Sequence, residues 1–376
     1  MKKKIKQLLK MFLKTKYIKT SLKILLTIIL YYFFQKQYLK ITDNIPDIRN
    51  INKDQFFRLK DKPQDQNNIL IQQEKQSLLN FFSNSTKRNI TYVDTVFVTQ
   101  NFNFGNQMII INKIIFYCEI LGCKRIILDK NINWFIKNRI NYTEYNMTIE
   151  VGERKDFRNY KTIFDNSDNF LYYYSIIKPE FRADVIKHEI LNNLPKVEVN
   201  TNDLFIYIRS GDIFKYPHVF YSQPPLCFYK NIIKNNKFRK IYIIAQDNFN
   251  PVINNLLYEY PYIQFDRNPI NIDIAYLMTA YNIVGGISTF INVLLRLNDN
   301  LEFFWEYDID SLDAKIIHFH HSLYKPFKNI TYYRMEPSNQ YKSLMNIWNG
   351  NETQINLMLK DNCTNNFTII NDFTND

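Results

Sequence analysis

The stretch that decides the fold reads Leu204-Phe205-Ile206-Tyr207-Ile208-Arg209-Ser210-Gly211-Asp212. An apolar run of this length, ending abruptly in polar and turn-forming residues, predicts a buried β-strand. This strand would place the Arg209 guanidinium, a short turn and the Asp212 carboxylate at a single edge of a sheet. An arginine fork matches the geometry of phosphate oxygens, so this edge is a candidate anion site.

A second strand, Ile283-Val284, runs through Gly285-Gly286 into Ser288-Thr289-Phe290, which open an apolar helix. The N-terminus of a helix offers unpaired backbone N–H groups and the positive end of the helix dipole to an anion. Together, Arg209 and this helix start indicate a protein that holds a phosphorylated ligand without a metal.

Strands and helices are expected to alternate through the second half of the chain. Strands are predicted at 204–209, 240–246, 262–266, 283–287 and 302–307, and helices at 224–235, 250–259, 272–281 and 289–297. This alternation predicts a doubly wound parallel α/β sheet, whose ligands bind at the carboxyl ends of the strands. Four candidate residues lie at those ends, namely Arg209, Asp212, Asp247 and Ser288.

The first half carries a shorter version of the same pattern. We predict a βαβ unit with parallel strands, formed by a strand at 93–99, a loop at 101–106, a helix at 107–121 and a strand at 124–128. Residues 130–200 are harder to interpret, with helices expected near Trp134 and at 183–193. A helical tail is expected at 337–359 and is predicted to fold back on the domain.

The positive charge of the chain is concentrated at its start. Residues 1–40 contain eleven lysines and no acidic residue, and subtracting these from the net charge of +12 leaves about +1 for the remainder. A nucleic-acid-binding protein usually carries its positive charge on the folded domain. The distribution therefore argues against a nucleic-acid partner.

The basic leader contains an uncharged apolar stretch from Ile24 to Phe34. Counted from Thr20, with Lys23 reaching the interface, the stretch is long enough for a thin bilayer. No small-residue cleavage site follows, so we expect a retained signal anchor that leaves the N-terminus cytosolic and the rest luminal. The alternative is a lysine-rich amphipathic surface helix.

These patterns predict a domain plan. We expect a cytosolic tail at 1–19, a transmembrane anchor at 20–36, a stem at 37–90, two Rossmann-like domains at 91–200 and 201–336, and a helical tail at 337–376. Luminal exposure agrees with eight N-x-S/T sequons and permits disulfides. The four cysteines allow three pairings, and the sequence does not choose among them.

Three patches of this sequence resemble the fucosyltransferase superfamily, whose α1,2-, α1,6- and protein O-fucosyltransferases use GDP-fucose. Phe104-Gly105-Asn106-Gln107 resembles its G-N-Q loop, and residues 207–212 resemble its H-x-R-R-x-D motif. Asp273-x-x-x-Leu277-Met278, continuing through residues 287–290 and 297–298, resembles its last donor-binding motif. The resemblance covers roughly residues 93–308 and implies a GT-B fold without a metal or another cofactor.

The resemblance also implies roles for particular residues. Arg209 would contact the β-phosphate of the donor, and the other expected donor-binding residues are Gly105, Asn106, Asp247, Ser288, Thr289 and Phe290. Asp212 is a candidate general base, although a mechanism assisted by the acceptor would need none. Several of these residues have a simpler alternative: a salt bridge between Arg209 and Asp212, an ordinary turn and cap at Gly105 and Asn106, a helix cap for Asp247, and a core ring for Phe290. The sequence departs from the family at Tyr207, where the family has histidine, and at Ser210, where it has a second arginine.

Other patterns indicate metal sites only weakly. Asp308-Ile309-Asp310 is a D-x-D that falls after the last expected strand, and we interpret it as a solvated turn. His318-Phe319-His320-His321 lacks a third ligand nearby, and His188-Glu189 lacks the second histidine of H-E-x-x-H. No metal site is therefore predicted.

The sequence thus predicts a single-pass type II membrane glycoprotein of the Golgi or endoplasmic reticulum. Its luminal domain would transfer fucose from GDP-fucose to a glycan or glycoprotein acceptor, with inversion. The alternatives are a GT-B glycosyltransferase with another nucleotide sugar, and a catalytically inactive glycan-binding relative.

Overall fold

A computed structural model describes residues 72, 75–76, 79–80, 94–98, 103–129, 140–142, 147–152, 186–187, 194–217, 221–308, 330–363 and 366–370. The chain divides into units of residues 1–72 and 73–376, and all elements named below belong to the second unit. Among the described residues, no helix is long and apolar enough to cross a membrane. The predicted anchor at 20–36 lies outside the described residues, as does most of the predicted stem.

The first sheet is built on the predicted βαβ unit. Strand β1 (Thr95–Val98) leads into helix α5 (Phe104–Leu121) and then into β2 (Arg125–Asp129), and the two strands pair in parallel. Strand β4 (Met147–Gly152) pairs in parallel with β2, and β3 (Ile140–Tyr142) pairs antiparallel with β4. The strand order is β1-β2-β4-β3, which confirms the parallel βαβ expected from the sequence.

The second sheet has the strand order β10-β9-β8-β7-β5-β6. All neighbouring pairs are parallel except β9 with β10. The strands are β5 (Asp203–Tyr207), β6 (Lys240–Ile244), β7 (Asn282–Val284), β8 (Phe303–Tyr307), β9 (Thr331–Met335) and β10 (Phe367–Ile370). The α/β class with parallel sheets is therefore confirmed and is consistent with a Rossmann-like arrangement.

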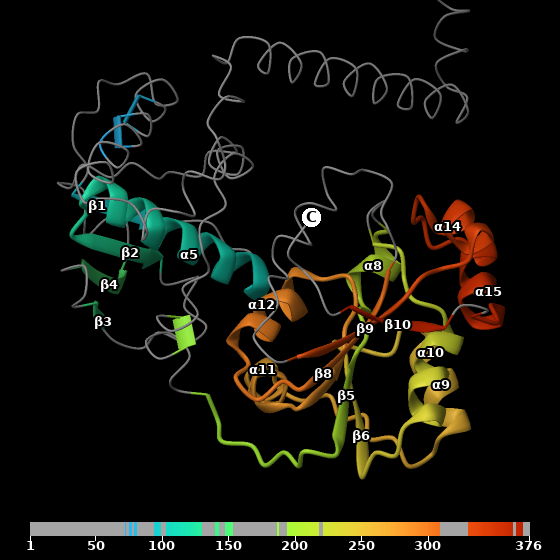
Figure 1. Ribbon diagram of the computed structural model, residues 1–376. Coiled ribbons are helices and arrows are strands. Elements are labelled where there is room, and N and C mark those ends of the chain that lie inside the picture. The colour runs from blue at the N-terminus through green and yellow to red at the C-terminus, as the bar shows by residue number, and fades with distance from the viewer. Residues whose placement is uncertain are drawn as a thin grey trace, which may run out of the picture. The chain divides into compact units, whose positions relative to one another are not determined.

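Alternate residues of β5 face opposite sides of this sheet. Phe205 and Tyr207 join a core cluster with residues of α11 (Ile270–Thr279) and α12 (Thr289–Leu297). Leu204 and Ile206 join a different cluster, with residues of α9 (Leu226–Asn235) and α10 (Pro251–Glu259). Figure 1 shows the sheet between these two helical layers. A strand buried on both faces explains why residues 204–208 are continuously apolar.

The order of the strands creates a switch point beside β5. The chain passes from β5 through α9 to β6 on one side, and then through α11 to β7 on the other side of β5. In doubly wound sheets, ligands bind outside the carboxyl ends of the strands at such a switch point. The carboxyl ends of β5 and β7 are therefore the candidate ligand-binding position of this fold.

Helix α5 begins earlier than predicted because its first turn packs against α12. The sequence suggested a loop at 101–106, but the helix starts at Phe104, whose ring contacts that of Phe290 edge-on, with the centroids 5.7 Å apart. Gly105 is buried against the backbone of Thr289 and Phe290. Tertiary packing thus overrides the local loop signal of residues 101–106.

Two predicted elements in the second half differ from the structure. The strand expected at 262–266 is reduced to a single parallel bridge between Gln264 and Tyr242, because a turn closed by the Ile263 N–H and the Tyr260 carbonyl occupies its start. The tail forms α14 (Asn339–Met345) and α15 (Glu352–Lys360) as expected, but it is followed by β10, which the sequence did not reveal. Strand β10 is a short edge strand, so its pairing with β9 defines it more than its own composition does.

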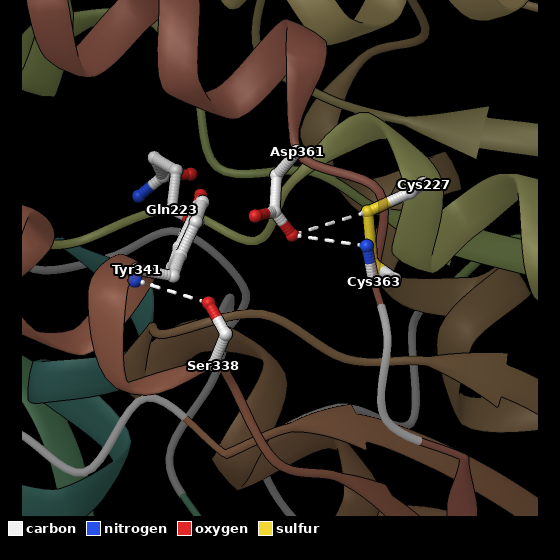
Figure 2. Close-up of a disulfide and its surroundings, with 6 residues drawn as sticks. All are labelled: Gln223, Cys227, Ser338, Tyr341, Asp361 and Cys363. Carbon is white, nitrogen blue, oxygen red and sulfur yellow. Dashed lines mark hydrogen bonds between the residues drawn. A yellow bond between two sulfur atoms is a disulfide. The ribbon is translucent and has the colours of Figure 1, made fainter.

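One of the possible cysteine pairings is present in the structure. Cys227, in the first turn of α9, forms a disulfide with Cys363, which follows α15 (Figure 2). Cys118 and Cys123 are free thiols buried in the core around α5. The disulfide and the contacts of α15 with α9 and α10 confirm that the tail folds back on the domain.

Candidate functional site

Three segments that are far apart in the sequence meet at the switch point. The end of β5 carries Arg209 and Asp212, the start of α12 carries Ser288 to Phe290, and the start of α5 carries Gly105. The ring of Tyr207 lies 5.5 Å from that of Phe290, which in turn contacts Phe104. The three sequence patches are therefore parts of a single structural cluster.

Arg209 is held by a carboxylate and by an aromatic ring. Its Nη2 atom donates to both oxygens of Asp212, at 2.8 Å each. Its guanidinium lies over the ring of Tyr221, with Cζ 5.7 Å from the centroid. The Arg209 side chain is 16% exposed, whereas that of Asp212 is 51% exposed. The ion pair that the sequence offered as the simpler alternative is present, and together with Tyr221 it fixes a largely buried cation.

Tyr207 adds a buried hydroxyl to this cluster. The Tyr207 hydroxyl lies near the side chains of Ser288 and Arg209. Burial raises the pKa of Tyr207, so the phenol remains protonated. Burial by itself would lower the pKa of Arg209, but the nearby oxygens of Tyr207 and Asp212 outweigh it and raise that pKa. Arg209 is therefore a permanent cation at the end of β5.

One donor of Arg209 remains unsatisfied within the described part of the chain. Its Nε atom is buried and makes no hydrogen bond to any described residue. An unsatisfied buried donor costs free energy that a suitably placed acceptor recovers. Arg209 thus keeps one buried N–H group that no described residue accepts from, although its Nη2 is paired with Asp212.

Ser210, which stands where the resembling family has a second arginine, is only 1% exposed. Its hydroxyl lies 2.5 Å from Oδ1 of Asp247, to which it donates, and accepts from the backbone N–H of Asn250 at 2.9 Å. The side-chain amide of Asn250 donates to the carbonyl of Arg209 at 3.0 Å. Ser210 therefore joins the loop after β5 to the loop after β6, and an arginine has no room there.

One carboxylate oxygen of Asp247 is already used in hydrogen bonds within the protein. Its Oδ1 also accepts from the backbone N–H of Phe249 at 3.0 Å, so this oxygen organises the loop that precedes α10. Gly211, with φ of 72°, allows the two loops to approach closely, since a Cβ there would lie 2.9 Å from the other Asp247 oxygen. A helix-capping role for Asp247 is not observed, because Asn250 caps α10.

The side chains of Ser288 and Phe290 make helix-capping and packing contacts inside the fold. The Ser288 hydroxyl is buried and caps α12 by accepting from the N–H of Phe290 at 3.2 Å. Thr289 is half-buried, and its backbone lies against Gly105. Asn106, the next residue of α5, is exposed. Phosphate binding by Ser288 and Thr289, and donor binding by Asn106, remain predictions from the sequence.

Asp273 is a second unusual carboxyl near the sheet. It lies in the first turn of α11, as the sequence indicated. Burial raises its pKa from 3.8 to about 7, although a hydrogen bond with the Asn268 side chain opposes this shift. Within the described part of the chain, its buried Oδ1 has no hydrogen-bond partner. Asp273 therefore accepts a proton far more readily than an ordinary aspartate.

The sequence did not identify three contributors to the cluster. Tyr221 lies beneath Arg209 from a loop without any recognisable motif, and the Asn250 amide holds the Arg209 carbonyl. The ring of Tyr207 packs against Phe290 and its hydroxyl lies near Arg209 and Ser288, whereas the sequence treated Tyr207 only as a departure from histidine. Only tertiary proximity, and no local spacing, could have revealed these contacts.

The described residues include one geometric grouping suited to a metal, formed by Cys227, Asp361 and Cys363. The two thiols are joined as the disulfide, so they are not free to ligate. Asp308 is not in a solvated turn as expected: its side chain is 12% exposed and lies 3.6 Å from Arg334. Asp310 and the histidines at 318, 320 and 321 lie outside the described residues.

Comparisons of the chain with protein-family models, with curated proteins and with solved structures found no match. The site is therefore interpreted from its own geometry. That geometry offers a fixed guanidinium with a buried unpaired N–H, a neighbouring exposed carboxylate, and a helix start at a topological switch point. Such an arrangement is suited to binding an anionic ligand such as a diphosphate.

Proposed function

We propose that this protein is a glycosyltransferase that transfers fucose from GDP-fucose to a glycan or glycoprotein acceptor. The observation that carries the proposal is the position of Arg209, whose buried Nε–H lacks a partner among the described residues at the switch point between β5 and β7. The convergence of residues 104–107, 207–212 and 287–290 on this point supports the resemblance that suggested the donor.

The proposed reaction breaks the bond between the sugar and the diphosphate. The acceptor hydroxyl attacks the anomeric carbon from the opposite face, which inverts the configuration, and the diphosphate leaves with its negative charge. In this proposal Arg209 stabilises that charge, and the backbone amides at the start of α12 are the second candidate donors. Asp212 is proposed as the base that takes the proton of the acceptor hydroxyl, because its carboxylate is half exposed beside Arg209.

The wider architecture belongs to the same proposal. The two parallel sheets, with contact between α5 and α12, are consistent with a GT-B arrangement in which residues 91–200 serve the acceptor and residues 201–336 hold the nucleotide sugar. We propose that residues 20–36 anchor the protein as a type II membrane glycoprotein of the Golgi or endoplasmic reticulum. The basic leader and the sequons support this location.

One observation favours a different donor or an inactive glycan-binding relative. Ser210 is buried and engaged with Asp247 and Asn250, so the loop is built without a second arginine. A single guanidinium provides less positive charge to balance a diphosphate than two arginines would. A transferase for another nucleotide sugar, or a protein that only binds glycans, is therefore the second candidate.

Thermal unfolding of residues 73–376 with GDP, UDP and GDP-fucose, each with and without EDTA, tests the proposal. We expect GDP and GDP-fucose to raise the melting temperature in both conditions, because ligand binding stabilises the folded state. Stabilisation by UDP alone would point to another donor. A lack of response to all three would favour the inactive relative.

Arg209→Ala should abolish both transfer and the GDP-induced rise in melting temperature. Arg239→Ala is the matched control, because Arg239 pairs with Asp203 at 2.6 Å at the amino end of the same strand. We expect this control to retain its response to GDP, measured against its own ligand-free melting temperature. Full activity of Arg209→Ala would contradict the assignment of the site.

A further inference from the structure

The loop between β5 and α9 is held at both ends by the C-terminal helical pair, which we define as residues 339–360, comprising α14, α15 and their connection. This loop carries Arg209 near its start and Tyr221 near its end. Its regular structure within the described residues is the short helix α8 (Asp212–Lys215). The position of Arg209 therefore depends on what fixes α8 and the segment that contains Tyr221.

Trp348 fixes α8. Its indole Nε1–H donates to the carbonyl of Ile213 at 3.0 Å, and its ring meets that of Phe214 edge-on, with the centroids 5.4 Å apart. Trp348 is 1% exposed, so this hydrogen bond is shielded from water. Gly350, two residues later, lies so close to Pro217 that a Cβ there would be 3.2 Å from the proline ring. The connection between α14 and α15 thus contacts α8 at Ile213 and Phe214 and the chain after it at Pro217.

Tyr341 and Met345 fix the other end of the loop. The hydroxyl of Tyr341, a fully buried residue, donates to the carbonyl of Gln223 at 2.7 Å. The hydroxyl of Ser222 donates to the carbonyl of Met345. Both contacts directly follow Tyr221, whose ring supports the guanidinium of Arg209. Figure 2 shows Tyr341 and Gln223 near the disulfide.

The helical pair is itself rigidly built. The buried side chain of Gln354 donates to the carbonyls of Leu344 and Ile347 at 2.9 and 2.8 Å. Its oxygen accepts from the N–H groups of Asn349 and Gly350 at 3.0 and 3.1 Å. After α15, the disulfide to Cys227 ties the end of the pair to α9. The Gln354 amide thus holds the backbone on both sides of Trp348, at the Ile347 carbonyl and the Asn349 N–H.

We propose that Trp348 is a positioning residue for the anion site and acts on Arg209 through α8 and Asp212. Trp348 does not contact the ligand. It fixes the backbone of α8, which carries Asp212, and the Asp212 carboxylate accepts from Nη2 of Arg209. Small displacements of such a group reduce the binding of a charged ligand markedly. The inference rests on the proposed function for its ligand, but its structural part stands independently.

The test compares Trp348→Phe with Trp305→Phe in the full chain. Trp305 is also buried, at 4% exposed, but lies in β8, stacked on Tyr333 with the centroids 5.3 Å apart. We expect Trp348→Phe to speed amide hydrogen exchange in residues 208–216 about tenfold, and to weaken GDP binding by about tenfold. Trp305→Phe should change neither. In turnover assays, the loss should appear in the KM for the donor more than in the KM for the acceptor.

The outcomes separate this inference from the proposed function. If the wild-type protein does not bind GDP, the proposed function fails, but faster exchange specific to Trp348→Phe would still support the positioning of the loop. Unchanged exchange in residues 208–216, or unchanged GDP affinity despite faster exchange, would overturn the inference. If Trp348→Phe does not fold, Phe214→Leu, which removes the ring contact with Trp348, replaces it; this variant should also speed exchange in residues 208–216, and unchanged exchange there would overturn the inference.

Discussion

Gly105 at the start of α5 lies directly against Phe290 at the start of α12. A Cβ added to Gly105 would lie 2.5 Å from the backbone nitrogen of Phe290 and 2.5 Å from the carbonyl carbon of Thr289. Both atoms belong to the backbone and cannot move aside alone. The glycine of the G-N-Q patch therefore serves helix packing in this protein, and the contact joins α5 to the helix that begins at the switch point.

Gly105→Ala should destabilise the fold by about 1–3 kcal/mol, because overpacking against the backbone outweighs the better helix propensity of alanine. Urea unfolding measures the change. Asn106→Ala, at the exposed neighbouring position, is the control and should alter stability by less than about 0.5 kcal/mol. Equal stability of Gly105→Ala and the wild type would show that the two helices do not pack this closely.

Restoring the arginine of the resembling family should damage this protein. Ser210→Arg places a long charged side chain where the serine is 1% exposed, so we expect a loss of more than about 3 kcal/mol or a failure to fold. Ser210→Ala should cost about 1–3 kcal/mol, because it leaves the buried N–H of Asn250 without its acceptor. Ser343→Arg, at an exposed serine, is the matched control. A stable Ser210→Arg with tighter GDP binding would contradict the structural role of Ser210.

Asp273 makes the stability depend on pH. Its pKa in the folded protein, about 7, lies above the ordinary value of 3.8, so the folded state binds the proton more tightly than the unfolded chain does. The contribution of this group to stability is present below pH 4 and is lost as the pH rises toward 7. Asp273→Asn should therefore raise the melting temperature at pH 8 but not at pH 4. The exposed Asp266→Asn is the control, and a gain that does not depend on pH would refute the assignment.

The Cys227–Cys363 disulfide closes a loop with a sequence separation of 136 residues. A cross-link of this length restricts the unfolded chain, and the double variant Cys227→Ser/Cys363→Ser should lower the free energy of unfolding by about 2–5 kcal/mol. Denaturation of the wild-type protein in the presence of a reducing agent should give the same loss. A reduced wild-type protein as stable as the oxidised one would show that the bond is not formed in solution.

The sequence determined the elements wherever local pattern and burial agree. Residues 204–208 are apolar at every position because both faces of β5 are covered, and this run indicated a buried strand, while the alternation of strands and helices indicated a parallel sheet. The carboxyl-end position of Arg209 followed from the same pattern. The edge elements were harder to predict: the strand expected at 262–266 is a single bridge, and β10 depends on its partner β9. Edge strands carry a weak signal because only part of their surface is buried.

The site shows the same division. By itself, the sequence determined which chemical groups stand at the ends of the strands, because strand ends follow from hydrophobic pattern and turn residues. Only the tertiary structure decided how those groups are used. It paired Arg209 with Asp212, turned Ser210 toward Asp247, and placed Tyr221 beneath the guanidinium. The physical reason is that hydrogen bonds and ring contacts form between residues close in space, and no sequence spacing records that proximity.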